Sequence, residues 1–290
     1  MHPGLLVSKY TAIKQLVCSH LLRALSIYTD IVKMPRILGK NIPLSKGRDD
    51  NRVLYISGIA LQLSKSHNRE AMEIAGGITS HFLVADGDVL GVQVVPPGWI
   101  YLELTHPFLA AWLQNLVEGG GEEGERGRGG RRVSREGDGR LFAVQYAHAR
   151  CCSLLRLAVR EGLIEFWETE ADANPAFGSA IPSKPIPWLN CDEKLRLNHP
   201  AELRLIAELV QAVDNLENSD EVVSSLKWEK AALNLSQAFE NFWSKCRIWG
   251  EVKITSPELA QARLGLLMAT QSVLRFLLEE KIGISALSEL

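Results

Sequence analysis

Residues 118–140 divide the chain into two parts that must fold around separate cores. Apart from Val133, this stretch has no apolar residue and consists almost entirely of Gly, Glu and Arg. Because it cannot bury apolar surface, it cannot contribute to a hydrophobic core. We interpret it as a solvated flexible linker; the alternative is that its Gly and Arg residues contact RNA, as Gly/Arg-rich tails do. The sequence therefore predicts two domains, residues 1–117 and 141–290.

The first predicted domain combines helical and strand patterns. Two short runs rich in β-branched and aromatic residues, 89–95 and 99–104, predict strands joined by a Pro-Pro-Gly turn. Apolar residues also recur at helical spacing, with Asn68 placed as an N-cap. The helices predicted in this domain cover residues 5–33, 53–63, 68–81 and 108–117. This part of the chain is therefore expected to be a small α+β domain.

The second predicted domain is helical except for residues 167–199, where four prolines interrupt any helix. Asn198 or His199 is placed to cap the second helix, and a capping box at 255–258 to begin the fourth. Its predicted helices cover residues 141–165, 200–216, 225–249 and 255–283. The fold class predicted for the whole chain is mainly α, with a C-terminal helix bundle preceded by the α+β domain and the linker.

Composition and charge limit the possible functions. The five cysteines have no paired spacing, which is typical of a reducing compartment. No stretch has the uninterrupted apolar run of a secretory signal or a bilayer-spanning helix. We therefore expect a soluble cytoplasmic protein with no membrane partner. Because the formal net charge is only -2, any nucleic-acid site must be local.

The helix predicted at 141–165 carries the main candidate site. Tyr146 and Arg150 are four residues apart and lie on the face opposite the apolar one, where a ring and a guanidinium are neighbours. A ring can stack on an unpaired base, and the planar fork of Arg can reach a base edge or a phosphate. Arg156 adds to a run of four arginines that precedes the first acid of this segment, Glu161. The segment is therefore basic, although the chain is not.

Other interpretations of these residues remain open. Tyr146 could pack on a neighbouring element, and Arg150 could pair with a carboxylate. His148 lies next to the cysteines at 151 and 152, which suggests a metal site, but the helical pattern directs all three inward and no second cluster completes a ligand set. We expect His148 to be a buried, hydrogen-bonded histidine, and we predict no metal and no cofactor.

The segment at 145–150 reads QYAHAR, and it resembles the opening helix of the DALR-type anticodon-binding domain of class I arginyl-tRNA synthetases. Segments similar to the later helices of that domain follow in order, at 199–206, 239–247 and 262–284. The resemblance implies that the domain grips the anticodon loop of a tRNA through Tyr146 and Arg150. It also brings in Trp243, which stands where a Tyr is usual in the family.

Residues 92–109 are similar to the strand, turn and helix of the same family's N-terminal additional domain, which implies contact with the corner of a tRNA. The family's catalytic domain, with its HIGH-type and KMSKS-type motifs, would fall where the linker stands. Residues 118–140 are too few for a βαβ unit, which needs about 30 residues. We therefore expect no independent aminoacylation.

The resulting prediction is a stand-alone tRNA-binding protein, linked to arginyl-tRNA aminoacylation by resemblance. Two alternatives are a protein-interaction or regulatory scaffold whose RNA binding has decayed, and an accessory subunit that acts in trans with a separate catalytic chain.

Overall fold

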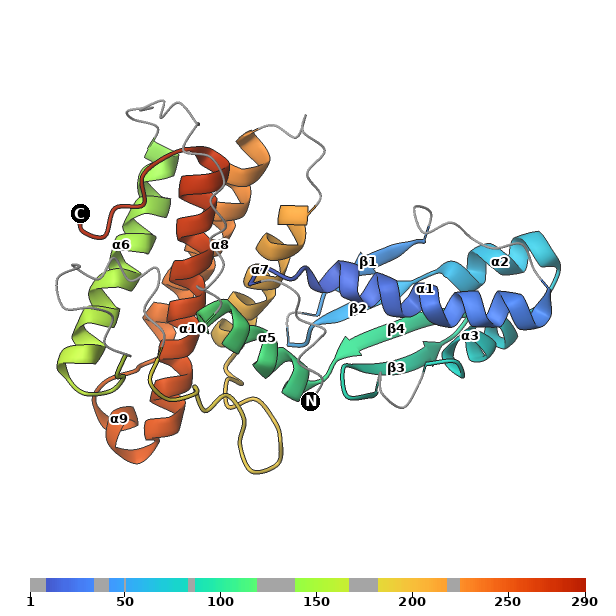
Figure 1. Cartoon of the computed structure of the whole chain (residues 1–290), viewed down its shortest axis with the longest axis horizontal. Coiled ribbons are helices and arrows are strands. Elements are labelled where there is room, and N and C mark those ends of the chain that lie inside the picture. The colour runs from blue at the N-terminus through green and yellow to red at the C-terminus, as the bar shows by residue number, and fades with distance from the viewer. Residues whose placement is uncertain are drawn as a thin grey trace. The chain divides into compact units, whose positions relative to one another are not determined.

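The computed structural model describes residues 9–33, 42–49, 51–82, 87–118, 139–166, 182–217 and 225–290. They form two compact units, one comprising residues 12–109 and the other comprising residues 9–11 with those that follow residue 109 (Figure 1). Most of the predicted linker lies outside the described residues. Within them, no helix has the length and apolar character needed to cross a bilayer.

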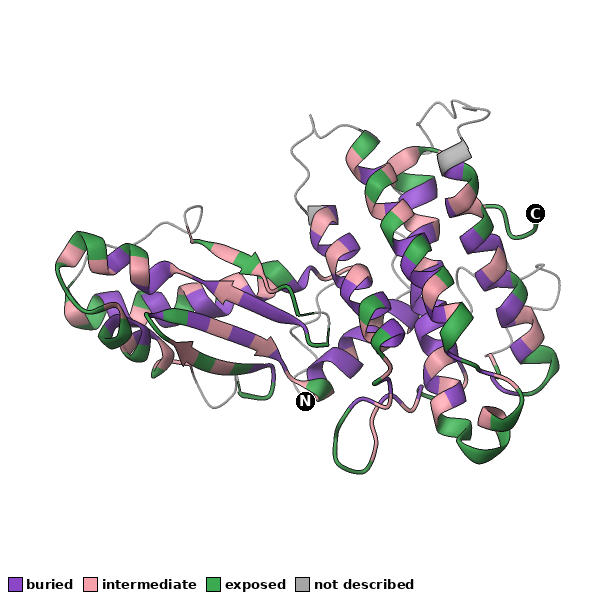
Figure 2. Ribbon diagram, turned by 180° about the vertical axis from the view of Figure 1, so that it is seen from behind, coloured by how far each residue is buried: buried purple, intermediate pink, exposed green. Residues whose placement is uncertain are grey.

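The first unit is an antiparallel sheet of strand order β1-β2-β4-β3, packed with three helices. Its strands are β1 (Leu44–Lys46), β2 (Leu54–Ser57), β3 (Leu90–Val95) and β4 (Trp99–Leu104). Its helices are α1 (Ile13–Val32), α2 (Ile59–His67) and α3 (Ala71–Thr79). Burial alternates along β4, where Ile100, Leu102 and Leu104 are buried and the intervening residues are not (Figure 2). One face of the sheet therefore packs on the core and the other is open.

The two predicted strands and the α+β character of this unit are confirmed, but three helix predictions are wrong in part. Residues 53–63 do not form one helix, because 54–57 pair with β4 as strand β2 before α2 begins. Asn68 is not an N-cap: with φ of 53° it ends α2, and its N–H donates to Ser64 O. The first helix begins at Ile13, because residues 9–12 are not helical; the predicted residues 5–8 lie outside the described part of the chain.

The second unit contains most of α5 (His106–Glu118) and a helix bundle (Figure 1). The bundle helices that pack on one another are α6 (Gly139–Arg160), α7 (Pro200–Glu217), α8 (Ser225–Lys245) and α10 (Pro257–Phe276). A short helix α9 (Glu251–Thr255) precedes α10, and a π-helical turn η3 (Leu277–Ile282) follows it. The prediction of a mainly helical C-terminal part is confirmed.

The ends of these helices have local causes. α6 ends at Arg160 rather than at residue 165, before Gly162 with its φ of +65°. α7 begins at Pro200 as predicted, and His199 caps it, since its Nδ1 accepts the N–H of Ala201 at 3.1 Å. The predicted capping box at 255–258 does not form: Thr255 ends α9 and its hydroxyl donates to Glu251 O, while the N-cap of α10 is Ser256, whose side chain makes no capping hydrogen bond.

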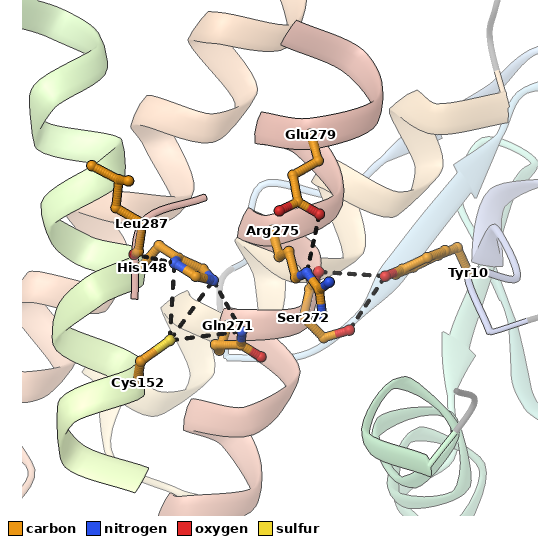
Figure 3. A network of polar contacts seen from close by, with 8 residues as sticks. All are labelled: Tyr10, His148, Cys152, Gln271, Ser272, Arg275, Glu279 and Leu287. Atoms are coloured by element: carbon orange, nitrogen blue, oxygen red, sulfur yellow. Dashed lines mark hydrogen bonds and ion pairs between the residues drawn. The ribbon is translucent and has the colours of Figure 1, made fainter. Parts of the chain in front are cut away.

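Residues before the first unit also pack in the second one. The ring of Tyr10 lies 4.5 Å from that of Phe276, and its hydroxyl lies 3.3 Å from the Oγ of Ser272 (Figure 3). Trp112 of α5 is fully buried and donates its indole N–H to Thr11 O at 2.9 Å. The helical unit is therefore assembled from segments that are far apart in the sequence.

Candidate nucleic-acid interface

Helix α6 presents Tyr146 and Arg150 on its outward face. The side chain of Tyr146 is 46% exposed, and Arg150, one turn further along, is half-buried. Val144, Ala147 and Cys151 on the opposite face are fully buried in the bundle. The helical periodicity therefore separates core from surface as the sequence predicts.

Trp243, near the end of α8, lies against Arg150. The guanidinium carbon stands over the indole ring at 5.3 Å from its centroid, within the range of a cation–π contact. No carboxylate among the described residues forms an ion pair with Arg150. In the structure, Arg150 therefore does not pair with a carboxylate, contrary to the alternative interpretation of the sequence. The face of an indole ring offers no lone pair to these N–H groups. The N–H donors of the Arg150 guanidinium therefore remain available to hydrogen-bond a ligand.

A second indole, which the sequence interpretation missed, stands behind Trp243. Trp249 makes an edge-to-face contact with it, at 5.8 Å between centroids and 76° between ring planes. The Nε1 atom of Trp249 is buried and has no hydrogen-bond partner among the described residues. Nothing in the local sequence indicates this pair, since Trp249 follows the end of α8 at Lys245 and no helical spacing connects it with Trp243.

The turn that carries Trp249 is fixed by a buried ion pair. Arg263 of α10 donates from Nε to the Glu202 carboxylate at 2.6 Å, and from Nη1 to the backbone carbonyl of Arg247 at 2.5 Å. The side chain of Glu202 has no exposed surface, and its other carboxylate oxygen accepts the N–H of His199 at 2.9 Å. The interior of the bundle thus holds the segment beside Trp243 in place.

Arg156, the fourth predicted site residue, lies apart from these three. Its Nη2 donates to the carbonyl of Ser288 at 2.9 Å and lies 3.3 Å from a carboxylate oxygen of Glu289. The structure therefore brings Tyr146, Arg150 and Trp243 to one surface and engages Arg156 with the C-terminal segment.

Comparison with known proteins identifies the helical part of the chain. The family model described as DALR anticodon binding domain matches residues 144–290, half of the chain. The chain belongs to this family. All four predicted site residues lie within the matched DALR domain.

Related proteins agree with this assignment. The chain is 30% identical to an arginine–tRNA ligase of Moorella thermoacetica over 153 residues, which are 53% of this chain and 23% of that protein. It is 34% identical to the arginine–tRNA ligase of Pelodictyon phaeoclathratiforme over 138 residues, 48% of this chain and 21% of the relative. The matches thus span less than a quarter of the length of these curated relatives. No solved structure matches the chain.

The C-terminal segment of the DALR domain runs along α6 and is held by its side chains. Gln145 donates to Ser285 O at 3.3 Å, and the buried His148 lies 2.9 Å from Leu287 O through Nδ1 (Figure 3). Gln271 of α10 lies 2.9 Å from the other ring nitrogen of His148. Since a carbonyl can only accept, Nδ1 carries the proton, and Nε2 accepts from the amide of Gln271.

Burial lowers the pKa of His148 below its usual value of 6.5, so the ring is neutral near pH 7. The expectation of a buried, hydrogen-bonded histidine is confirmed. Burial also raises the pKa of the neighbouring Cys151 well above the usual thiol value. Among the described residues, no three His, Cys, Asp or Glu side chains form a group that could hold a metal ion.

The first unit has a shallow hollow of about 340 Å³ against β3 and β4. Tyr101, Gln93 and Arg52 are among the residues that line it. Arg52 lies 2.9 Å from a carboxylate oxygen of Asp49 and 3.1 Å from one of Glu103. This guanidinium is therefore already neutralised, and the hollow adds no free positive charge from Arg52.

Proposed function

We propose that this chain binds the anticodon loop of a tRNA through the DALR domain, as a stand-alone tRNA-binding protein that does not aminoacylate by itself. The observation that carries the proposal is the Arg150 guanidinium over the Trp243 ring, beside the exposed ring of Tyr146. Such a surface offers a stacking platform for an unpaired base and a guanidinium fork for a base edge or phosphate. Membership of the DALR family and similarity to arginine–tRNA ligases support tRNA as the RNA.

The local electrostatics agree with an RNA ligand. Arg150 has no carboxylate partner among the described residues, and it lies one helical turn from the exposed ring of Tyr146. An arginine that binds a phosphate releases counterions from RNA, so affinity should fall as salt rises. The near-neutral net charge makes this patch, rather than the whole chain, responsible for binding.

The test is the affinity of the full chain for an anticodon stem-loop, measured at several salt concentrations. Tyr146→Ala and Arg150→Ala are each expected to weaken binding by roughly 1 to 3 kcal/mol. Arg160→Ala is the matched control, since it removes an exposed arginine from the same helix without touching the patch. Unchanged affinity after both site replacements together would refute the proposal.

The net charge of -2 also favours a second candidate, a docking scaffold for another protein such as a separate synthetase chain. This candidate predicts no tRNA binding even at low salt, together with a protein partner recovered by pull-down. An accessory role in trans would appear as a change in the rate of arginylation, or in the tRNA affinity of the synthetase, when this chain is added.

A further inference from the structure

One turn before Tyr146, helix α6 exposes a second aromatic ring. Phe142 is 58% exposed, more than Tyr146 itself. The two ring centroids lie 6.4 Å apart, and the ring planes differ by only 25°. Neither ring is needed to fill the core, because Val144 and Ala147 on the buried face of the helix already do so. An apolar ring left this far in water costs hydrophobic free energy, which is recovered if a ligand covers it.

We propose that Phe142 and Tyr146 together bind two consecutive unpaired nucleotides of an RNA loop, one base on each ring; this rests on the proposed function. Phe142, Tyr146 and Arg150 stand four residues apart, so they mark three positions about 6 Å apart along the axis of α6. Phe142 is thus a binding residue at the end of the site furthest from Trp243.

The distance between the rings of Phe142 and Tyr146 indicates which kind of RNA they can bind. Bases stacked in a strand follow one another at roughly 3.4 Å, which is far shorter than the 6.4 Å between the two rings. Two neighbouring bases can engage both rings only when they are unstacked from each other. A loop with splayed nucleotides meets this condition and a duplex does not, so the pair favours single-stranded RNA.

The ring pair is also pre-organised. Side chains four residues apart on a helix hold each other in place, and the near-parallel contact between the rings of Phe142 and Tyr146 restricts both. Less side-chain freedom is therefore lost when a base stacks on either ring. Phe142 contributes both its own stacking surface and the orientation of its neighbour.

The experiment measures affinity of the full chain for anticodon stem-loops with Phe142→Ala, Phe142→Leu and Tyr146→Ala. Each change is expected to weaken binding about 5- to 150-fold, since stacking one base is worth roughly 1 to 3 kcal/mol. Phe142→Leu keeps apolar bulk without a ring, so a loss in this variant reports stacking rather than folding. Val159→Ala, which alters another exposed apolar side chain of α6, should leave affinity unchanged.

A second set of stem-loops, each lacking one loop base, assigns the two rings. The effect of Tyr146→Ala should vanish on the RNA that lacks one particular base. The effect of Phe142→Ala should become smaller on the RNA that lacks the adjacent base, where only its effect on the orientation of Tyr146 remains. If both effects vanish on the same RNA, or if the Phe142 variants bind as wild type while Tyr146→Ala is impaired, the two-base site is wrong and the proposed function stands. If the wild-type chain binds no stem-loop, the proposed function itself fails.

Discussion

Replacing Arg263 tests how much the buried ion pair between Arg263 and Glu202, which fixes the turn beside the candidate RNA surface, stabilises the DALR domain. We predict that Arg263→Met lowers the free energy of unfolding of the helical unit by about 3 to 5 kcal/mol. The Arg263 side chain is 11% exposed and the Glu202 side chain 0%, and 2.6 Å separates Nε of Arg263 from the nearer carboxylate oxygen. Without Arg263, the carboxylate keeps the N–H of His199 but has no positively charged partner, and it becomes an uncompensated buried charge.

A second variant shows whether the loss of stability in Arg263→Met comes from a buried charge or from a missing contact. If the cost arises from the unpaired carboxylate, removing that charge as well should restore stability. Glu202→Gln keeps an oxygen that can accept the His199 N–H, so Glu202→Gln combined with Arg263→Met should be more stable than Arg263→Met alone. A double variant no more stable than that single variant would contradict this explanation.

Guanidinium chloride unfolding followed by tryptophan fluorescence is a suitable assay, since Trp112, Trp188 and Trp228 are buried in this unit. Arg275→Met is the matched control: it breaks an ion pair with Glu279 whose side chains are 31% and 36% exposed. The control should change stability by less than about 0.5 kcal/mol. A loss below about 1 kcal/mol for Arg263→Met would refute the reasoning.

Three further predictions concern the same unit. Gly265→Ala should destabilise it by about 1 to 3 kcal/mol, although Ala normally favours a helix, because a Cβ there would lie 2.6 Å from the Trp188 ring; thermal unfolding measures this. Since burial lowers the pKa of His148 below 6.5, the unfolding free energy should fall as pH decreases from about 6.5, and this fall should be smaller in His148→Gln; urea titrations at several pH values test it. Burial raises the pKa of Cys246 to about 11, so at pH 8 this thiol should react with iodoacetamide far more slowly than the exposed Cys191, as peptide mass spectrometry can show.

Sequence periodicity predicted those parts of the fold that local spacing determines. The strands β3 and β4 and the four bundle helices were predicted because each carries a long enough pattern of period 2 or 3.6. The apolar run at 53–63 failed because it is short, and pairing of Leu54–Ser57 with β4, about 46 residues later, decides its conformation. Asn68 can cap either end of a helix, and its positive φ becomes visible only in the structure.

The candidate site shows the same limit. Tyr146 and Arg150 are neighbours by helical spacing, so the sequence alone brings them together. Trp243 was inferred from family resemblance, but its contact with Trp249 depends on the turn that follows α8. The contact of Arg156 with Ser288 joins residues 132 positions apart, which no local pattern can indicate.

The assembly of the helical unit from distant segments affects how this domain can be transferred between proteins. Tyr10 packs on Phe276, Thr11 accepts the indole N–H of Trp112, and Gln114 of α5 accepts that of Trp188 at 2.6 Å. A gene fragment that begins at α6 would lack Tyr10, Thr11 and Gln114. Phe276 would then lose its packing partner and Trp188 its hydrogen-bond acceptor. Recombination that preserves the bundle must therefore include the segments on both sides of residues 12–109. The sheet unit is then transferred with it, as an insertion within the sequence of the helical unit.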